Sequence, residues 1–391
     1  MASKSTLIAA VLVAAFIVVA AVVVLNPGIY NLDDNDKETK AVGDVYGREV
    51  EIRTPLENIV LPASDSFRAY VAVAGDDWLD LLAGGLGDFE TNGRSYYDAF
   101  CEIEPRLKDL PDIGNAWVGG PDIEKTLELN PDLLILDKSA KEYEFLKGDY
   151  EKALNDAGMP YVFIDFYMDP YGKVEDGTYN YVQSMSILGE VLGKEDRAKD
   201  ISNYFEDKMR EIVPSIPKEG RTVYMEFMYG PEAIEYMTTN FGEPEIGFMN
   251  GRNIAAEWVA GANGVPTNFE GVHSKDPDVI VLAYSTYFNA DPSQQLFGYG
   301  MESTDEELAE LMAKYVGRVG WKELTAVKNK DVHMMYAQFR ATLEAIMNVQ
   351  YMAMWPYPDV YGDLTPEEDL EEMYDLFMPI EFKGVWSYKF V

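Results

Sequence analysis

The chain carries one sequence pattern twice, at a constant separation. Residues 124–136 read EKTLELNPDLLIL, and residues 270–282 read EGVHSKDPDVIVL. Each copy is a glutamate, six further residues, Pro-Asp and four apolar residues, and the second copy lies 146 positions after the first (270 − 124 and 277 − 131). Solenoid repeats have periods of about 20 to 50 residues. A period this long instead predicts two similar lobes, each with a helix end or turn leading into a buried strand, and a ligand between them.

The chain begins with a long apolar segment. Residues 7–25 are 19 consecutive apolar residues without glycine, proline or charge, enough helix to span the ~30 Å hydrocarbon core of a bilayer. Lys4 precedes this segment and an acidic stretch, residues 33–36, follows it, so the N-terminus should stay inside the cell. A cleaved signal peptide has a shorter apolar region and a small-residue cleavage site, which residues 22–27 do not offer. We therefore expect an uncleaved anchor over residues 1–30 and an extracytoplasmic ligand-binding part. A cleaved signal peptide is the alternative.

Charge restricts the partners of this chain. It has 32 Lys and Arg against 68 Asp and Glu, a formal net charge of −36. Such a field repels nucleic acid and anionic lipid, so we expect no nucleic-acid partner. Cys101 is the single cysteine and can form no internal disulfide; we expect a small buried apolar residue there. We also expect a monomer without a cofactor.

Strand and helix patterns alternate along the chain. In the first half we expect a hairpin over 42–52, strands at 58–62, 133–136 and 161–165, a helix ending at Gly84-Gly85, and helices over 121–129 and 181–192. A longer helix over 194–213 places Ala198, Ile201, Phe205, Met209 and Ile212 on one face. In the second half we expect strands at 221–227, 279–282 and 332–336, and helices at 255–260, 306–315 and 342–354.

This alternation indicates α/β lobes with largely parallel sheets. The expected organisation is a tether over 31–41, an N-terminal lobe over 42–193, an interlobe helix over 194–217, and a C-terminal lobe over 218–391 that ends in an acidic and aromatic tail.

Five stretches point to one family by their order and spacing. They are DVYGREV (44–50) with NIV (58–60), IG (113–114) with VGGPDIEK (118–125), residues 188–198, residues 268–282, and WKELTAVKNKDV (321–332). Together they resemble the substrate-binding proteins of ABC importers, of the type with one helical backbone between two lobes. That type includes binders of iron–siderophores, haem and cobalamin. The resemblance implies two Rossmann-like lobes with a ligand cleft between them, and a permease dimer as partner.

The resemblance also implies two docking residues. In this family one glutamate per lobe docks onto arginines of the permease, and the matching positions are Glu124 and Glu270. Two carboxylates, one on each lobe, can bind two basic pockets of a dimeric permease. The alternative is that each carboxylate only stabilises the dipole of its own helix.

Residues beyond the carboxyl ends of the expected strands are candidates for ligand binding, because ligands of α/β sheets bind there. The set is aromatic with two arginines: Arg68, Tyr70, Trp117, Tyr167, Tyr229, Tyr284, Tyr287, Phe339 and Arg340. Aromatic faces and cations suit a bulky, flat, anionic ligand. We expect an iron complex of siderophore type, with cobalamin or haem as alternatives. Ordinary packing is the alternative for each tyrosine, and a local salt bridge for each arginine.

Other functions find less support in the sequence. The resemblance implies that relatives which bind zinc or manganese use about three histidines and a carboxylate. The chain has only His273 and His333, so no metal site is expected. The sequence holds no Gly-x-Ser-x-Gly, His-Glu-x-x-His or phosphate-loop motif, so we do not expect an enzyme. A membrane-anchored adhesion or sensory ectodomain with the same fold stays open, because fold does not fix function.

Overall fold

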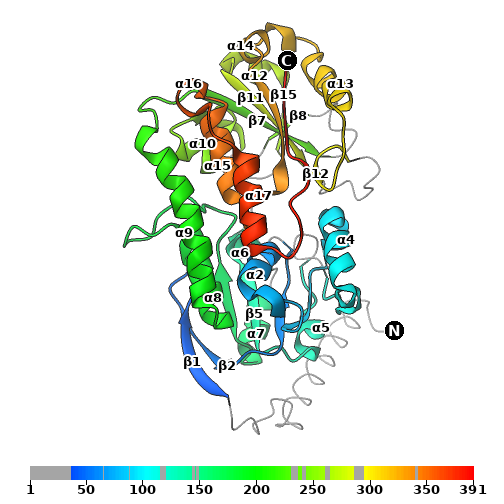
Figure 1. Ribbon diagram of the computed structural model, residues 1–391, viewed down its shortest axis with the longest axis vertical. Coiled ribbons are helices and arrows are strands. Elements are labelled where there is room, and N and C mark those ends of the chain that lie inside the picture. Colours follow the sequence, from blue (N-terminus) through cyan, green and yellow to red (C-terminus); the bar gives the residue numbers. More distant parts are fainter. Residues whose placement is uncertain are drawn as a thin grey trace, which may run out of the picture.

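The computed structural model describes residues 37–64, 66–87, 89–114, 120–142, 146, 149–229, 237–239, 244–259, 265–285, 295–339 and 342–391. Two α/β lobes follow one another along the long axis of the molecule (Figure 1). The expected anchor over residues 1–30 lies outside the described residues. From Lys37 onward, no described helix is long and apolar enough to cross a bilayer.

The first lobe is built on a four-stranded parallel sheet with strand order β4-β3-β5-β6. Its strands are β3 (Ile59–Leu61), β4 (Leu82–Gly85), β5 (Leu133–Asp137) and β6 (Tyr161–Ile164). Strands β3, β5 and β6 are buried along their whole length, as expected for parallel strands covered on both faces. The lobe also contains α2 (Phe67–Ala74), α3 (Phe89–Asn92), α4 (Arg94–Ile103), α5 (Ile123–Glu128), α6 (Lys138–Glu142) and α7 (Tyr150–Asp156). The expected hairpin precedes the sheet as β1 (Glu38–Gly43) and β2 (Glu49–Thr54), so β1 begins within the stretch assigned to the tether.

The expected helix end at Gly84-Gly85 is wrong, because these glycines belong to strand β4. The backbone of Gly84 is in register with Val60, and that of Gly85 with Leu61. A Cβ at Gly85 would lie 2.1 Å from the Leu61 carbonyl oxygen, and Gly85 has a φ of +113°. The two glycines therefore serve close strand packing and not a helix stop.

The second lobe is built on a five-stranded sheet with strand order β15-β13-β11-β7-β9. Strands β7 (Thr222–Tyr229), β9 (Arg252–Asn253), β11 (Val279–Ser285) and β13 (Val332–Tyr336) are parallel, and β15 (Ser387–Lys389) joins the edge antiparallel. Its helices include α10 (Pro244–Phe248), α11 (Ala256–Val259), α12 (Phe269–Lys275), α13 (Asp305–Val316) and α14 (Thr325–Lys328). Two small ribbons pair β8 (Met237–Thr239) with β10 (Val265–Thr267), and β12 (Gly298–Tyr299) with β14 (Gly384–Val385).

A pair of packed helices leads from the first lobe to the second, and its second member makes the connection. Helix α8 (Asn180–Leu192) turns at Gly193, a left-handed residue, into α9 (Glu195–Ile212). The five residues expected on one face of α9 are all buried, and Phe205 stacks on Tyr181 with ring centroids 4.1 Å apart. Helix α9 runs along the side of the molecule toward the second lobe (Figure 1). It covers residues 195–212 of the stretch 194–217 assigned to the interlobe helix, and a short 3-10 turn, Val213–Ser215, follows it.

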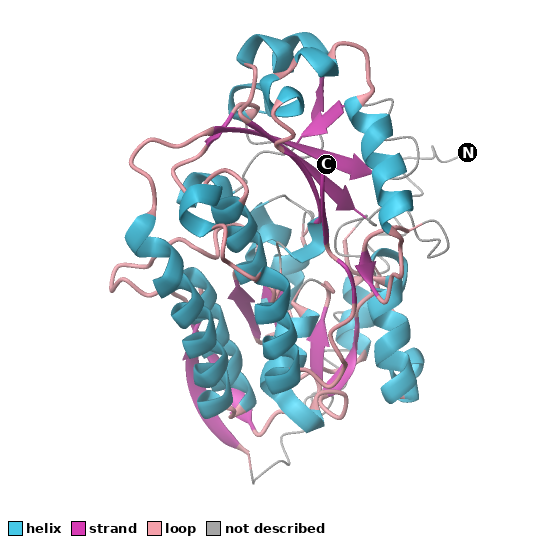
Figure 2. Cartoon of the chain, turned by 45° about the horizontal axis from the view of Figure 1, so that its top comes forward, coloured by secondary structure: helices cyan, strands magenta, loops and turns pink. Residues whose placement is uncertain are grey.

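The chain after β13 continues as α15 (Ala345–Met354), α16 (Pro358–Tyr361) and α17 (Pro366–Phe377). We call residues 366–391 the C-terminal strap. Helix α17 lies beside α9, where Lys208 pairs with Asp369 at 2.6 Å and the Tyr204 hydroxyl donates to the Asp369 carbonyl at 2.5 Å. From the end of α17 the strap runs back as an extended segment to the second lobe (Figures 1 and 2), where β15 completes the sheet.

A buried histidine in β13 gives the fold a measurable acid sensitivity. The ring of His333 stacks on Trp355 with centroids 4.6 Å apart, and neither ring nitrogen has a hydrogen-bond partner among the described residues. Burial, followed by the charges of Lys389 and Arg221, lowers the pKa of His333 from 6.5 to about 3. Between these two pKa values, His333 binds a proton in the unfolded chain but not in the folded chain. This contribution to stability is complete above pH 6.5 and is lost as the pH falls toward 3.

We expect His333→Phe to remove this sensitivity while keeping the stacked ring. Between pH 7 and pH 4, the wild type should lose on the order of 3 kcal/mol more free energy of unfolding than the variant. Burial raises the pKa of Asp137 and of Glu226 to about 7, which acts in the opposite direction, but both carboxyls are present in both proteins. Urea unfolding at the two pH values checks the prediction, and equal losses in the two proteins would contradict it.

Candidate functional site

The two copies of the sequence repeat form the same local structure. The Asp122 carboxylate caps α5 and accepts hydrogen bonds from the backbone N–H groups of Glu124 and Lys125 at 2.9 and 3.1 Å. The side-chain oxygen of Asn268 caps α12 and accepts from Gly271 N–H at 2.8 Å. The two caps are separated by the same 146 positions (268 − 122) as the glutamates.

Each copy then enters its strand in the same way. Asn130 and Asp276, also 146 positions apart (276 − 130), have φ angles of 47° and 42°. Both residue types tolerate this left-handed conformation. The chain reverses there and continues into β5 or β11, and each of these is an interior strand of its sheet. The repeat is therefore a capped helix, a left-handed turn and a central strand, once per lobe.

Glu124 and Glu270 occupy equivalent places in these units. Each is the second residue of its helix and lies in the first turn, and both side chains are exposed. Helix α5 belongs to the first lobe and α12 to the second (Figure 1). Each lobe thus presents an exposed carboxylate at the same position of its copy of the repeat, on a capped helix start where the backbone N–H groups favour negative charge.

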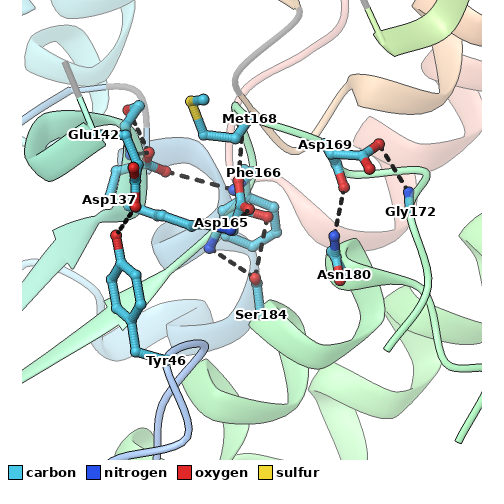
Figure 3. A network of polar contacts seen from close by, with 12 residues as sticks. Tyr46, Asp137, Glu142, Asp165, Phe166, Met168, Asp169, Gly172, Asn180 and Ser184 are labelled. Carbon is cyan, nitrogen blue, oxygen red and sulfur yellow. Dashed lines mark hydrogen bonds and ion pairs between the residues drawn. The ribbon is translucent and has the colours of Figure 1, made fainter. Parts of the chain in front are cut away.

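The carboxyl ends of β5 and β6 form a buried polar network (Figure 3). Asp137 ends β5 and accepts from Ser139 N–H at 2.8 Å. Asp165 follows β6; its side chain accepts from Met168 N–H at 2.8 Å, and its own N–H donates to the Ser184 hydroxyl at 2.8 Å. These bonds fix the loop after β6, which carries Tyr167 and Met168.

The same network concentrates negative charge. Asp137 and Asp165 are both buried, and Lys138 pairs with Asp165 at 3.2 Å. Burial and then the Asp165 charge raise the pKa of Asp137 to about 7. Asp137 can therefore exchange a proton near neutral pH.

Lobe 1 side chains bind the segment that follows β13. We call residues 338–339 and 342–345 the interlobe junction. Arg68 of α2 donates to the Glu344 carboxylate at 2.7 Å and to the Gln338 carbonyl at 3.2 Å. The hydroxyls of Tyr181 and Tyr171 donate to the carbonyls of Leu343 at 3.0 Å and Ala345 at 2.6 Å. Because Arg68 follows β3, Tyr171 follows β6 and the junction follows β13, the carboxyl edges of the two sheets meet here.

The expected ligand residues occupy different environments. Arg68 is buried and engaged with Glu344, Tyr70 is buried with its hydroxyl donating to the Trp78 carbonyl at 2.8 Å, and Phe339 is buried against Trp386. Tyr167 and Tyr284 are half-buried at the carboxyl ends of β6 and β11. Tyr229 is the last residue of β7. Trp117, Tyr287 and Arg340 lie outside the described residues.

Sequence reasoning missed Glu344, Tyr171 and Tyr181. A signal for Glu344 was present, because it is the one charged residue in the apolar stretch 342–354, and an acidic residue in such a stretch needs a buried partner. The two tyrosines carry no comparable signal in a chain with 26 of them. Of the two histidines, His273 is exposed and His333 is buried. Within the described ranges, no group of three or more His, Cys, Asp or Glu side chains could hold a metal ion.

The family model described as "Periplasmic binding protein" matches residues 71–338, which is more than half of the chain. The chain belongs to the periplasmic binding protein family. Members of this family are ligand-binding carriers that serve ABC importers, with an extracytoplasmic binding domain and a permease as partner. The resemblance drawn from the five sequence stretches is thereby confirmed.

Solved structures of the family agree with this fold. The TroA-like periplasmic binding protein FepB from Veillonella parvula is 26% identical, with a TM-score of 0.77, and the match covers 90% of this chain and 99% of that one. The molybdate-bound MolA of Haemophilus influenzae is 17% identical, with a TM-score of 0.60 and coverages of 88% and 99%. A second solute-binding protein from Veillonella parvula is 20% identical, with a TM-score of 0.59 and coverages of 88% and 94%. A comparison with curated protein sequences found no match.

Proposed function

We propose that this periplasmic binding protein delivers an iron complex of siderophore type to an ABC permease and docks on it through Glu124 and Glu270. The observation that carries the docking role is the duplicated unit, with an exposed glutamate at the equivalent position in each lobe. Both glutamates are exposed, so two carboxylates, one from each lobe, are available to two basic sites on a dimeric partner.

The proposed ligand lies between the carboxyl edges of the two sheets, beside the interlobe junction. Tyr167 and Tyr284, one from each lobe, support this position because they are half-buried at strand ends and can present aromatic faces to a chelate. Trp117, Tyr229, Tyr287 and Arg340 stay in the proposed set. A corrinoid or haem is the second candidate cargo, since its macrocycle offers a broad face to the same aromatic side chains.

The proposal includes attachment to the membrane through residues 1–30, with the two lobes outside. A tether on the outer face would keep the carrier close to its permease and raise its effective concentration there. An anchored adhesion or sensory ectodomain of the same fold is the competing function. That function needs no permease and hence no docking glutamates.

A thermal-shift screen of the full-length chain in detergent tests the ligand class. Ferric siderophores, haem, cobalamin, molybdate and bare metal ions are offered separately. A ligand at one hundred times its Kd should stabilise the folded state by about 2.7 kcal/mol, which appears as a raised melting temperature. A shift with a ferric siderophore supports the proposal. A shift with haem or cobalamin alone would make that compound the cargo in place of a siderophore. A shift with molybdate or a bare metal ion alone would contradict the proposal that the cargo is a metal chelate.

A further inference from the structure

The C-terminal strap contacts both lobes. Its last strand, β15, is part of the second lobe because Met334 and Met335 of β13 pair with Tyr388 and Ser387. Helix α17 reaches the first lobe, where its end lies close to α2 (Figure 1). The strap therefore leaves the second lobe, touches the first and returns.

Tyr374 of α17 makes the central contact with the first lobe. Its hydroxyl lies 2.9 Å from the hydroxyl of Tyr96 in α4, and it also donates to the Glu344 carboxylate at 2.5 Å. Arg68 lies over the Tyr96 ring, 4.4 Å from its centroid, and binds the same carboxylate. All four side chains are buried. One carboxylate thus joins α2 of the first lobe, the interlobe junction of the second and the strap.

The end of α17 is held by the interlobe helix. Arg197 of α9 donates to the Phe377 carbonyl at 3.0 Å and to the Ala72 carbonyl of α2 at 2.5 Å. Farther along, Asp369 of the strap accepts from Lys208 of α9 and from Gln350 of α15. The strap is therefore bonded to the first lobe, the connecting helix and the second lobe.

The charges of the network oppose separation of the two lobes. Burial alone would lower the pKa of Arg68, but the adjacent Glu344 carboxylate raises it above its ordinary value, so Arg68 stays protonated. Rotating the lobes apart would separate these charges inside a region of low dielectric, or would admit water to it. Tyr171 and Tyr181 would also lose their acceptors in the interlobe junction.

We propose that the C-terminal strap is an interlobe lock, which holds the two lobes at one fixed angle through the Tyr96–Tyr374–Glu344–Arg68 network. The lock is a second connection between the lobes, in addition to α9. The lock rests on the proposed carrier function in one respect only, which is its consequence for docking. With the lobes held at one angle, the permease meets Glu124 and Glu270 at a constant spacing.

The test measures the interlobe distance directly and requires neither ligand nor permease. Spin labels on Glu128→Cys in α5 and Glu310→Cys in α13, both exposed positions, report this distance in the full-length chain with Cys101→Ala. We expect one narrow distance distribution in the otherwise wild-type protein. The double variant Tyr96→Phe/Tyr374→Phe should shift it to longer distances and broaden it, and Glu344→Gln should do so more strongly.

Tyr150→Phe is the matched control, because the Tyr150 hydroxyl bonds to Thr126 within the first lobe and its loss should leave the distribution unchanged. If Glu344→Gln does not fold, the tyrosine double variant still decides. An unchanged distribution in a folded double variant would overturn the lock. The test measures a distance in the absence of ligand and permease. Its outcome therefore does not depend on whether the proposed cargo or the proposed docking glutamates are correct.

Discussion

Replacing both Glu124 and Glu270 by lysine is expected to reduce ligand uptake by about a hundredfold or more and to leave the ligand Kd unchanged. In the family that this chain resembles, the permease receives these glutamates with arginines. Lysine at both positions therefore replaces two attractive charge pairs by two repulsive ones. Close interfacial charge pairs are worth about 1.5 kcal/mol or more each, and two of them account for that factor. Uptake of radiolabelled iron chelate by cells carrying the permease measures the loss.

The control variant makes the same change in net charge at two other positions. Glu128→Lys/Glu310→Lys alters the net charge by the same amount at two exposed sites, one per lobe. We expect near-normal uptake from this control. Uptake by the Glu124→Lys/Glu270→Lys protein equal to that of the control would show that long-range charge, and not docking at these two places, governs the encounter.

Arg68→Ala is expected to destabilise the protein by about 3–5 kcal/mol, because it leaves the Glu344 carboxylate buried without its cation. Glu344 is fully buried and its ion pair with Arg68 measures 2.7 Å. Urea unfolding at neutral pH gives the free energy. Arg68→Met/Glu344→Leu should recover much of the loss, since replacing both members of a buried pair by apolar residues is often nearly neutral.

An exposed ion pair supplies the comparison. Arg94 pairs with Asp98 at 2.9 Å on the surface of α4, and Arg94→Ala should cost less than about 1 kcal/mol. If Arg68→Ala cost no more than Arg94→Ala, the buried network would not be what joins the lobes in this region.

The features that the sequence predicted correctly are those that depend on residues close together in the chain. The repeat around Glu124 and Glu270 combines a helix cap, a turn residue and a run of four apolar residues within a few positions, and all of these act over short range. The buried face of α9 was predictable for the same reason, because helical spacing alone places Ala198 and Phe205 together.

Contacts between distant segments were not predictable in this way. The glycines of β4 resemble a helix stop until Val60 and Leu61 are known to lie beside them. Arg68 was correctly placed after the first strand of the sheet, but its partner Glu344 lies 276 residues away. The path of the strap back to the first lobe likewise depends on Tyr96 and Tyr374, 278 residues apart. A single sequence contains no signal for such pairings.

The measurement that tests the carrier function most directly is ATP hydrolysis by the permease complex in proteoliposomes, with ferric siderophore and the full-length protein present. Addition of the loaded wild-type protein should stimulate hydrolysis, the Glu128→Lys/Glu310→Lys control should stimulate it equally, and the Glu124→Lys/Glu270→Lys protein should not. Equal stimulation by all three proteins would contradict docking through these glutamates. No stimulation by the loaded wild-type protein would contradict the delivery of an iron complex to this permease.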